Sequence, residues 1–138
     1  MKVIFSVDPG VKGHGWACWK DGVLVDCGWG FPPLIGYDAP HIVIEVPQVY
    51  QGRAQKGDPN DLIDLAFEAG KLVDGFEYTK IRPRAWKGTV PKPVMLQRIL
   101  AKLSDAELAL LRSVGVKKSV EKDVLDGIGI GLHYFKRL

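Results

Sequence analysis

Two carboxylates lie at the ends of short apolar runs. Asp8 follows the first run and is itself followed by Pro-Gly, and Glu45 lies near the end of a second run, over residues 41–46, that closes with proline. Runs of this kind predict short β-strands that carry an acid at one end. Asp123 and Asp126 have the i,i+3 spacing that places two side chains on one face of a helix. Three separate elements could therefore bring four carboxylates to one point.

Four carboxylates at one point would repel one another unless a cation neutralised them. Hard divalent cations with oxygen ligands are the usual partners of such a set, so we expect Mg²⁺, with Mn²⁺ able to replace it. The 3 His and 2 Cys residues have no zinc-ligand spacing. Two hard cations about 3.5–4 Å apart are used by phosphodiester-cleaving enzymes to activate water. The carboxylate set therefore predicts phosphodiester hydrolysis with two ions in the site.

The net charge is only +3, but the basic residues are unevenly distributed. Residues 78–104 contain no acid, and Trp86 lies among their cations. Cations follow phosphates while aromatic rings stack on bases, so this stretch favours a nucleic-acid surface. The alternative is a solvated basic face with a tryptophan in the core. The basic residues of the stretch are Lys80, Arg82, Arg84, Lys87, Lys92, Arg98 and Lys102.

Length and composition indicate one compact domain over residues 1–138, because 46% of the residues are hydrophobic and no low-complexity linker divides them. The apolar run at the start of the chain ends at Asp8, which is too short for a signal peptide. No run of 18 apolar residues suggests a membrane span. We therefore expect a cytoplasmic protein without a membrane partner.

Apolar periodicity and turn signals predict strands first, followed by alternating helices and strands. Ser104 and Glu107 have the spacing of a capping box at a helix start. The expected strands cover residues 2–8, 14–20, 23–29, 42–46 and 77–81. The expected helices cover residues 58–73, 93–103, a segment that begins at 104, and residues 119–135.

The last expected helix carries both aspartates at the border of its apolar stripe. Three glycines within it, at 127, 129 and 131, cost helix stability, so we expect them to permit close contact between the helix and the sheet. The predicted buried stripe comprises Val120, Val124, Ile128, Leu132 and Phe135.

The first expected hairpin turns at residues 21–22. A two-residue loop would place Cys18 opposite Val25 and would leave the sulfurs of Cys18 and Cys27 diagonal, so no disulfide is expected. His14 is expected to be an exposed residue at a strand edge.

Four short segments together resemble one known family: Asp8-Pro9-Gly10, Gly15-Trp16-Ala17, Ile44-Glu45 and Asp123-x-x-Asp126. In type, order and context they are similar to RuvC-type Holliday junction resolvases, of the small phage-like sort, within the RNase H-like nuclease superfamily. The resemblance implies an α/β fold with a mixed five-stranded sheet, three antiparallel strands and then parallel strands, flanked by helices.

The resemblance also implies roles for the four acids. Asp8, Glu45, Asp123 and Asp126 would be the catalytic and metal-binding residues, with two Mg²⁺ ions per site. Asp8 would bridge both ions, Glu45 would serve one, and the aspartate pair would serve the other.

The partners implied are branched DNA, chiefly four-way junctions, and a second copy of the chain. The homodimer would form through the helix near residues 60–73 and would make paired symmetric nicks during DNA recombination or repair, in a bacterial or phage-infected cell. Lys87 and Lys92 would correspond to two lysines near the scissile phosphate, and Tyr50 to an aromatic wedge. Further candidates for DNA binding are Arg53, Lys56, Arg82 and Arg84.

Three other readings have different consequences. Sugar-kinase and actin-like ATPases share the opening motif but need a second domain, for which 138 residues leave no room. A RuvX-like nuclease acting on RNA would have an apolar strand end where Glu45 stands. A non-catalytic junction-binding module would not need all four acids, and metal-dependent nicking separates it from an enzyme.

Overall fold

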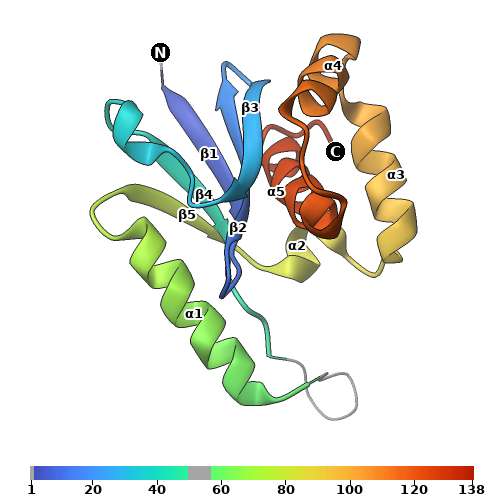
Figure 1. The fold of residues 1–138 in the computed structure, drawn as a ribbon. Helices are drawn as coiled ribbons and strands as arrows, with labels where there is room; N and C mark the ends of the chain where they lie inside the picture. The colour runs from blue at the N-terminus through green and yellow to red at the C-terminus, as the bar shows by residue number, and fades with distance from the viewer. Residues whose placement is uncertain (1, 50–56) are drawn as a thin grey trace.

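The computed structural model describes residues 2–49 and 57–138. Their strands form one five-stranded sheet of order β3-β2-β1-β4-β5 (Figure 1). The pairs β1/β2 and β2/β3 are antiparallel, whereas β1/β4 and β4/β5 are parallel. The predicted RNase H-like mixed sheet is therefore confirmed. The strands are β1 (Val3–Asp8), β2 (His14–Lys20), β3 (Val23–Gly30), β4 (His41–Glu45) and β5 (Glu77–Ile81).

Helices cover both faces of this sheet: α1 lies on one side, and α3, α4 and α5 lie on the other (Figure 1). The bounds are α1 (Pro59–Val73), α2 (Pro83–Lys87), α3 (Lys92–Lys102), α4 (Asp105–Val114) and α5 (Glu121–Tyr134), with the 3-10 turns η1 (Leu34–Gly36) and η3 (Lys118–Val120). Except for α2 and the two turns, each was predicted within about two residues. No helix among the described residues combines the length and the apolar character that a bilayer span requires.

The sheet separates two apolar cores. Alternate residues of β1 point to opposite faces, so Phe5 packs with Ala69 and Leu72 of α1 while Ile4 packs on the α5 side. Helix α5 is buried continuously from Val124 to Leu132. The predicted stripe is therefore too narrow within α5, because this helix lies between the sheet and α3 and is covered on both sides. It is also too long, because Val120 and Phe135 lie outside the helix and are only half-buried.

The glycines of α5 allow the close contact that their positions predict. A Cβ at Gly127 would lie 2.8 Å from the carbonyl oxygen of Gly15 in β2, and one at Gly131 would lie 2.3 Å from the Trp19 ring. A Cβ at Gly129 would instead meet the Trp86 ring at 2.6 Å. Two of the three glycines thus allow α5 to approach the sheet closely, and the third allows close packing against α2.

The first hairpin has the predicted two-residue turn, but its register departs from the prediction beyond Trp19. A β-bulge at residues 18–19 pairs Cys18 with Asp26 and pairs Ala17 with Cys27, so the two sulfurs lie on opposite faces of the sheet. Both cysteines are free, as predicted. The prediction for His14 is wrong: β2 is an inner strand, and His14 is buried with its Nδ1 accepting a hydrogen bond from the Gly10 N–H.

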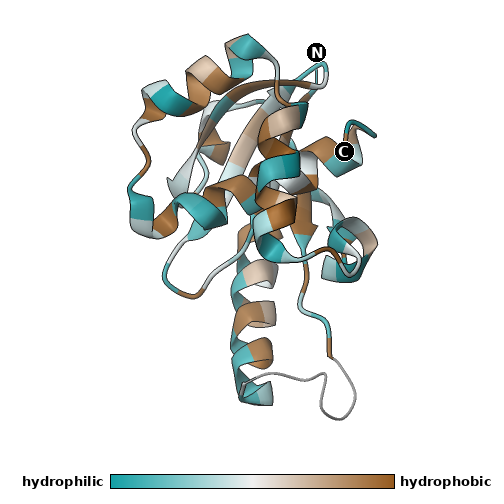
Figure 2. Ribbon diagram, turned by 90° about the vertical axis from the view of Figure 1, so that its right-hand side faces the viewer, coloured by the Kyte–Doolittle hydropathy of each residue, from teal (hydrophilic) through white to brown (hydrophobic). Residues whose placement is uncertain are grey.

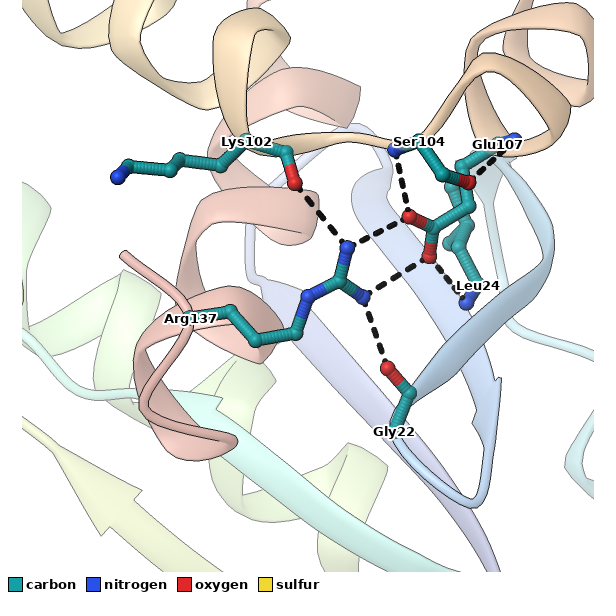
Figure 3. Close-up of polar contacts among 6 residues, drawn as sticks. All are labelled: Gly22, Leu24, Lys102, Ser104, Glu107 and Arg137. Carbon is teal, nitrogen blue, oxygen red and sulfur yellow. Dashed lines mark hydrogen bonds and ion pairs between the residues drawn. The ribbon is translucent and has the colours of Figure 1, made fainter.

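A buried ion pair ties the C-terminal segment to the first hairpin (Figure 3). Arg137 contacts both carboxylate oxygens of Glu107, at 2.6 and 3.0 Å, and also donates to the carbonyls of Gly22 and Lys102. Burial alone would raise the pKa of Glu107, but hydrogen bonds from Arg137 and from the backbone of Ser104 and Leu24 lower it to about 2. The predicted capping box of α4 is formed by the same Glu107.

Candidate active site

Two of the four predicted acids lie at the same edge of the sheet because their strands are parallel neighbours. Val7 of β1 pairs with Ile44 of β4, so Asp8 and Glu45 end the two strands side by side. Asp8 is half-buried, and the Glu45 side chain is 13% exposed. Each strand thus places one carboxylate at its carboxyl end, on the same side of the sheet.

Helix α5 brings the other two acids to the same place. Gly15, the cross-strand partner of Asp8, has no side chain, and a Cβ there would lie 1.9 Å from the carbonyl oxygen of Asp123. The helix backbone therefore sits directly on β2 beside Asp8. One turn further on, the Asp126 side chain is only 6% exposed.

A serine in β1 fixes the helix at this position. The Ser6 hydroxyl donates to the Gly127 carbonyl at 2.6 Å and accepts from the Trp19 indole at 2.8 Å. Both contacts are buried, and Gly127 directly follows Asp126. Nothing in the sequence pattern signals this bond, because Ser6 and Gly127 are 121 residues apart.

Trp86 holds Glu45 in place. Its indole Nε1 donates to Glu45 Oε2 at 2.6 Å, while its ring is 5% exposed and packs beside Gly129 of α5. Of the two interpretations of Trp86, a core position is therefore the correct one. The indole also links β4 with α5, so the site includes a residue whose role the sequence did not reveal.

Two lysines contact the acids. Lys87 Nζ lies 3.7 Å from Glu45 Oε2 and 3.9 Å from Asp126 Oδ2, so one ammonium group serves both carboxylates. Lys92 Nζ lies 3.2 Å from Asp126 Oδ2. Both lysines were predicted near the site, although as phosphate ligands, and Lys87 comes from the helix α2 that was not predicted.

The pKa values of the site residues are shifted by burial and by the nearby negative charges. Burial, and then the nearby charges of Glu45 and Asp126, raise the pKa of Asp8 well above its ordinary value, against the opposing effect of Lys87. Burial likewise raises the pKa of Glu45, while Lys87 and the Trp86 hydrogen bond work against that rise. Burial would lower the pKa of Lys92, but Asp126 raises it overall. The charges of Asp8, Glu45 and Asp126 therefore interact across the three elements.

Carboxylate oxygens are the ligands that Mg²⁺ and Mn²⁺ prefer, and a bound cation would relieve the repulsion among buried acids. The residues fit a hard divalent cation by donor type. Within residues 2–49 and 57–138, however, no three His, Cys, Asp or Glu side chains are arranged to hold a metal ion. In this arrangement the ammonium groups of Lys87 and Lys92 supply the positive charge.

The other predicted DNA-binding residues are placed in part. Arg82 and Arg84 are exposed; the Arg82 guanidinium donates to the Pro47 carbonyl, and the Arg84 backbone N–H donates to the Gln48 side chain. Both arginines thus lie beside the segment that follows Glu45. Tyr50, Arg53 and Lys56 lie outside the described residues.

No protein-family model matches the chain, and no curated protein matches it in sequence. Among solved structures, the fold is similar to that of the fowlpox virus Holliday junction resolvase, with 14% identity, 97% of each chain covered and a TM-score of 0.52. Two structures of Thermus thermophilus RuvC also match. One is in complex with a Holliday junction substrate, with 13% identity, 99% and 96% coverage and a TM-score of 0.47. The other has 15% identity, the same coverage and a TM-score of 0.43. At such low identity the likeness concerns the fold alone.

Proposed function

We propose that this chain is a metal-dependent endonuclease that resolves four-way junctions, or related branched DNA, by paired symmetric nicks. The observation that carries the proposal is the meeting of acids and lysines at one sheet edge. Carboxylates from β1, β4 and α5 interact there, and two lysines reach them. A carboxylate cluster bordered by cations suits a phosphodiester, whose hydrolysis needs both charge neutralisation and an activated water.

In this proposal the residues have distinct tasks. Divalent cations held by Asp8, Glu45, Asp123 and Asp126 would supply the activation of water and the stabilisation of the leaving oxygen. The Trp86 indole orients Glu45 by occupying one of its oxygens. Lys87 and Lys92 contact the phosphate that is cut or the one beside it, and they exchange their ion pairs with Glu45 and Asp126 for that contact.

We also propose that two copies of the chain act together, because a junction presents two equivalent strands. The proposal is supported by α1, whose N-terminal part extends beyond the sheet (Figure 1 and Figure 2). Ile63 and Phe67, one turn apart on that helix, are 66% and 67% exposed. Large apolar side chains that are exposed together on one helix face are candidates for an interface between copies.

A non-catalytic junction-binding module is the second candidate. The observation that favours it is the set of ion pairs from Lys87 and Lys92, which balance acid charge without any metal. Such a module would bind branched DNA and leave it intact.

The two candidates are separated by incubating labelled four-way junctions, flaps, forks, linear duplexes and matched RNA with the protein and Mg²⁺, Mn²⁺ or a chelator. We expect nicks on the junction at symmetric positions, only when a divalent metal is present. Binding without nicking at any metal concentration would support the second candidate. Cleavage of RNA in preference to DNA would contradict the substrate assigned here.

A further inference from the structure

A groove of about 650 Å³ runs along the free edge of the sheet, where β3 faces the segment between α4 and α5. We name it the Trp29 groove; its lining includes Trp16, Asp26, Gly28, Trp29, Val116 and Lys117. Pockets that hold planar organic ligands measure roughly 300–1,000 Å³, so the groove can admit a nucleobase.

Trp29 places this groove next to the acids. Asp8, Gly15 and Trp29 are successive cross-strand partners on β1, β2 and β3, so the Cα atoms of Asp8 and Trp29 are about 10 Å apart, two strand spacings. The Trp29 ring lies over Gly13, where a Cβ would be 2.6 Å from it. Trp29 therefore borders the turn that follows Asp8, on the side away from Lys87.

The aromatic surface at this edge is open to solvent. Trp29 is 40% exposed and Phe31 is 67% exposed, although both are large apolar side chains. The Phe31 ring contacts His14 edge-on, with ring centroids 6.1 Å apart, and His14 in turn holds Gly10 of the same turn. Two partly exposed rings thus flank the turn that follows Asp8.

Cations border the groove on its helical side. Lys117 lines it, and Lys118 and Lys122 follow within the next turns; all three side chains are exposed. The acids nearby are Glu121, which is exposed, and Asp26, which is half-buried and accepts from the Cys27 N–H. Asp8 and Asp123 of the acid cluster are both half-buried; Asp8 lies on the other side of Gly15 from Trp29, and Asp123 lies directly over Gly15. Among the exposed charged residues of 117–122, three lysines thus outnumber one glutamate, and Lys117 itself lines the groove.

We propose that the Trp29 groove binds an unpaired stretch of the DNA strand, with a base stacked on Trp29 or Phe31 and phosphates on Lys117 and Lys118. This inference rests on the proposed function and extends it to a second contact. Exposed rings beside cations are the usual elements of a single-strand site. At about 3.4 Å per nucleotide, the stacked base lies within about three nucleotides of the phosphate at Asp8.

A peptide strand added to the edge of β3 is the competing occupant. The β-bulge opposite Asp26 and the charge of Asp26 itself both work against that pairing, because bulges and charges are devices that protect sheet edges. The lysines also have no role in binding a strand backbone. The DNA strand is therefore the occupant that the side chains favour.

The test measures binding of a fluorescent oligothymidylate of about 15 nucleotides by anisotropy across a range of salt concentrations. Trp29→Ala should weaken binding about 5- to 100-fold, and Trp29→Phe should restore most of it. Phe31→Ala, at a more exposed position, gives a second measure if Trp29→Ala unfolds. Lys117→Ala and Lys118→Ala should each lower the salt slope by about 0.7.

Matched controls are Tyr134→Ala, at a ring 38% exposed at the far end of α5, and Lys20→Ala, at the opposite end of β2. Neither should change binding. Unchanged affinity in both Trp29→Ala and Phe31→Ala would overturn the inference, as would a change of oligomeric state with DNA binding intact. The proposed function fails separately, if the unaltered protein never nicks branched DNA with Mg²⁺.

Discussion

At the scale of single residues, Glu45 Oε2 accepts a hydrogen bond from the Trp86 indole and also forms an ion pair with Lys87. Outer hydrogen bonds of this kind set the orientation of a metal-binding carboxylate. Trp86 is therefore a positioning residue in the proposed site, although it is remote from Glu45 in sequence.

Trp86→Phe should preserve most of the packing and remove only the N–H donor. We expect metal affinity and cleavage to fall about 10- to 100-fold, the usual cost of losing an outer partner of a metal ligand. Calorimetric titration with Ca²⁺ measures affinity without turnover. An unchanged titration together with a lowered melting temperature would mean that Trp86 serves packing alone.

Asp8 gives a prediction on pH dependence in metal-free protein. Its pKa is raised in the folded state, so the folded state holds a proton that the unfolded state has released, and stability falls as pH rises above about 3.9. Asp8→Asn removes this effect and should raise the melting temperature at pH 7, but not at pH 3. Thermal melts of both proteins in chelator, at both pH values, check the sign. A variant that is less stable at pH 7 would contradict the account of crowded charge.

The four acids of the candidate site could be predicted from the sequence. Asp8 and Glu45 stand at strand ends and Asp123 and Asp126 at helical spacing, and these are local patterns that a sequence displays. The bonds from Ser6 to Gly127 and from Trp86 to Glu45 join residues far apart in the chain, so only the folded structure reveals them.

At the scale of elements, the strands and long helices follow their local signals. Asp58 caps α1 and Ser104 caps α4, as the sequence indicates. Helix α2 has only five residues, between Arg82 and Gly88, which is too short to display a period. The β-bulge at residues 18–19 also has no local signature, and it changed the hairpin register by one residue.

The Glu107–Arg137 pair predicts how the free energy of unfolding depends on pH in the acid range. The pKa of Glu107 is about 2 in the folded state, so the pair stabilises the fold above the unfolded value of about 4.3 and loses this effect as pH falls toward 2. Glu107→Gln should cost about 3 kcal/mol at pH 7 and progressively less below about pH 4. Urea unfolding across this range measures the difference.

Glu77→Gln is the matched control for that series. Glu77 also pairs with a cation, Lys2, at 2.6 Å, but its side chain is 69% exposed. Solvent screens an exposed pair and leaves it little effect on stability, so this variant should change little at any pH. Equal effects of the two substitutions would show that burial of Glu107 does not matter.

At the scale of the whole molecule, the exposed face of α1 predicts a homodimer. Phe67→Asp places a charge in the proposed interface and should convert a micromolar dimer to a monomer, because buried aromatic anchors dominate such interfaces. Ile35→Asp, at a residue 97% exposed on η1, is the control. Light scattering with and without junction DNA gives the mass. A monomeric unaltered protein under both conditions would contradict the prediction.

The central claim is that the acids at the sheet edge perform metal-dependent cleavage, and the most direct measurement compares unaltered protein with Asp8→Asn on one labelled four-way junction with Mg²⁺. Asp8→Asn should lower the cleavage rate more than about 100-fold, which is more than the loss of a hydrogen-bond partner of a metal ligand would cost. Junction affinity should persist, because the basic surface is intact. Cleavage by the variant at the unaltered rate, or loss of affinity in parallel with cleavage, would contradict the claim.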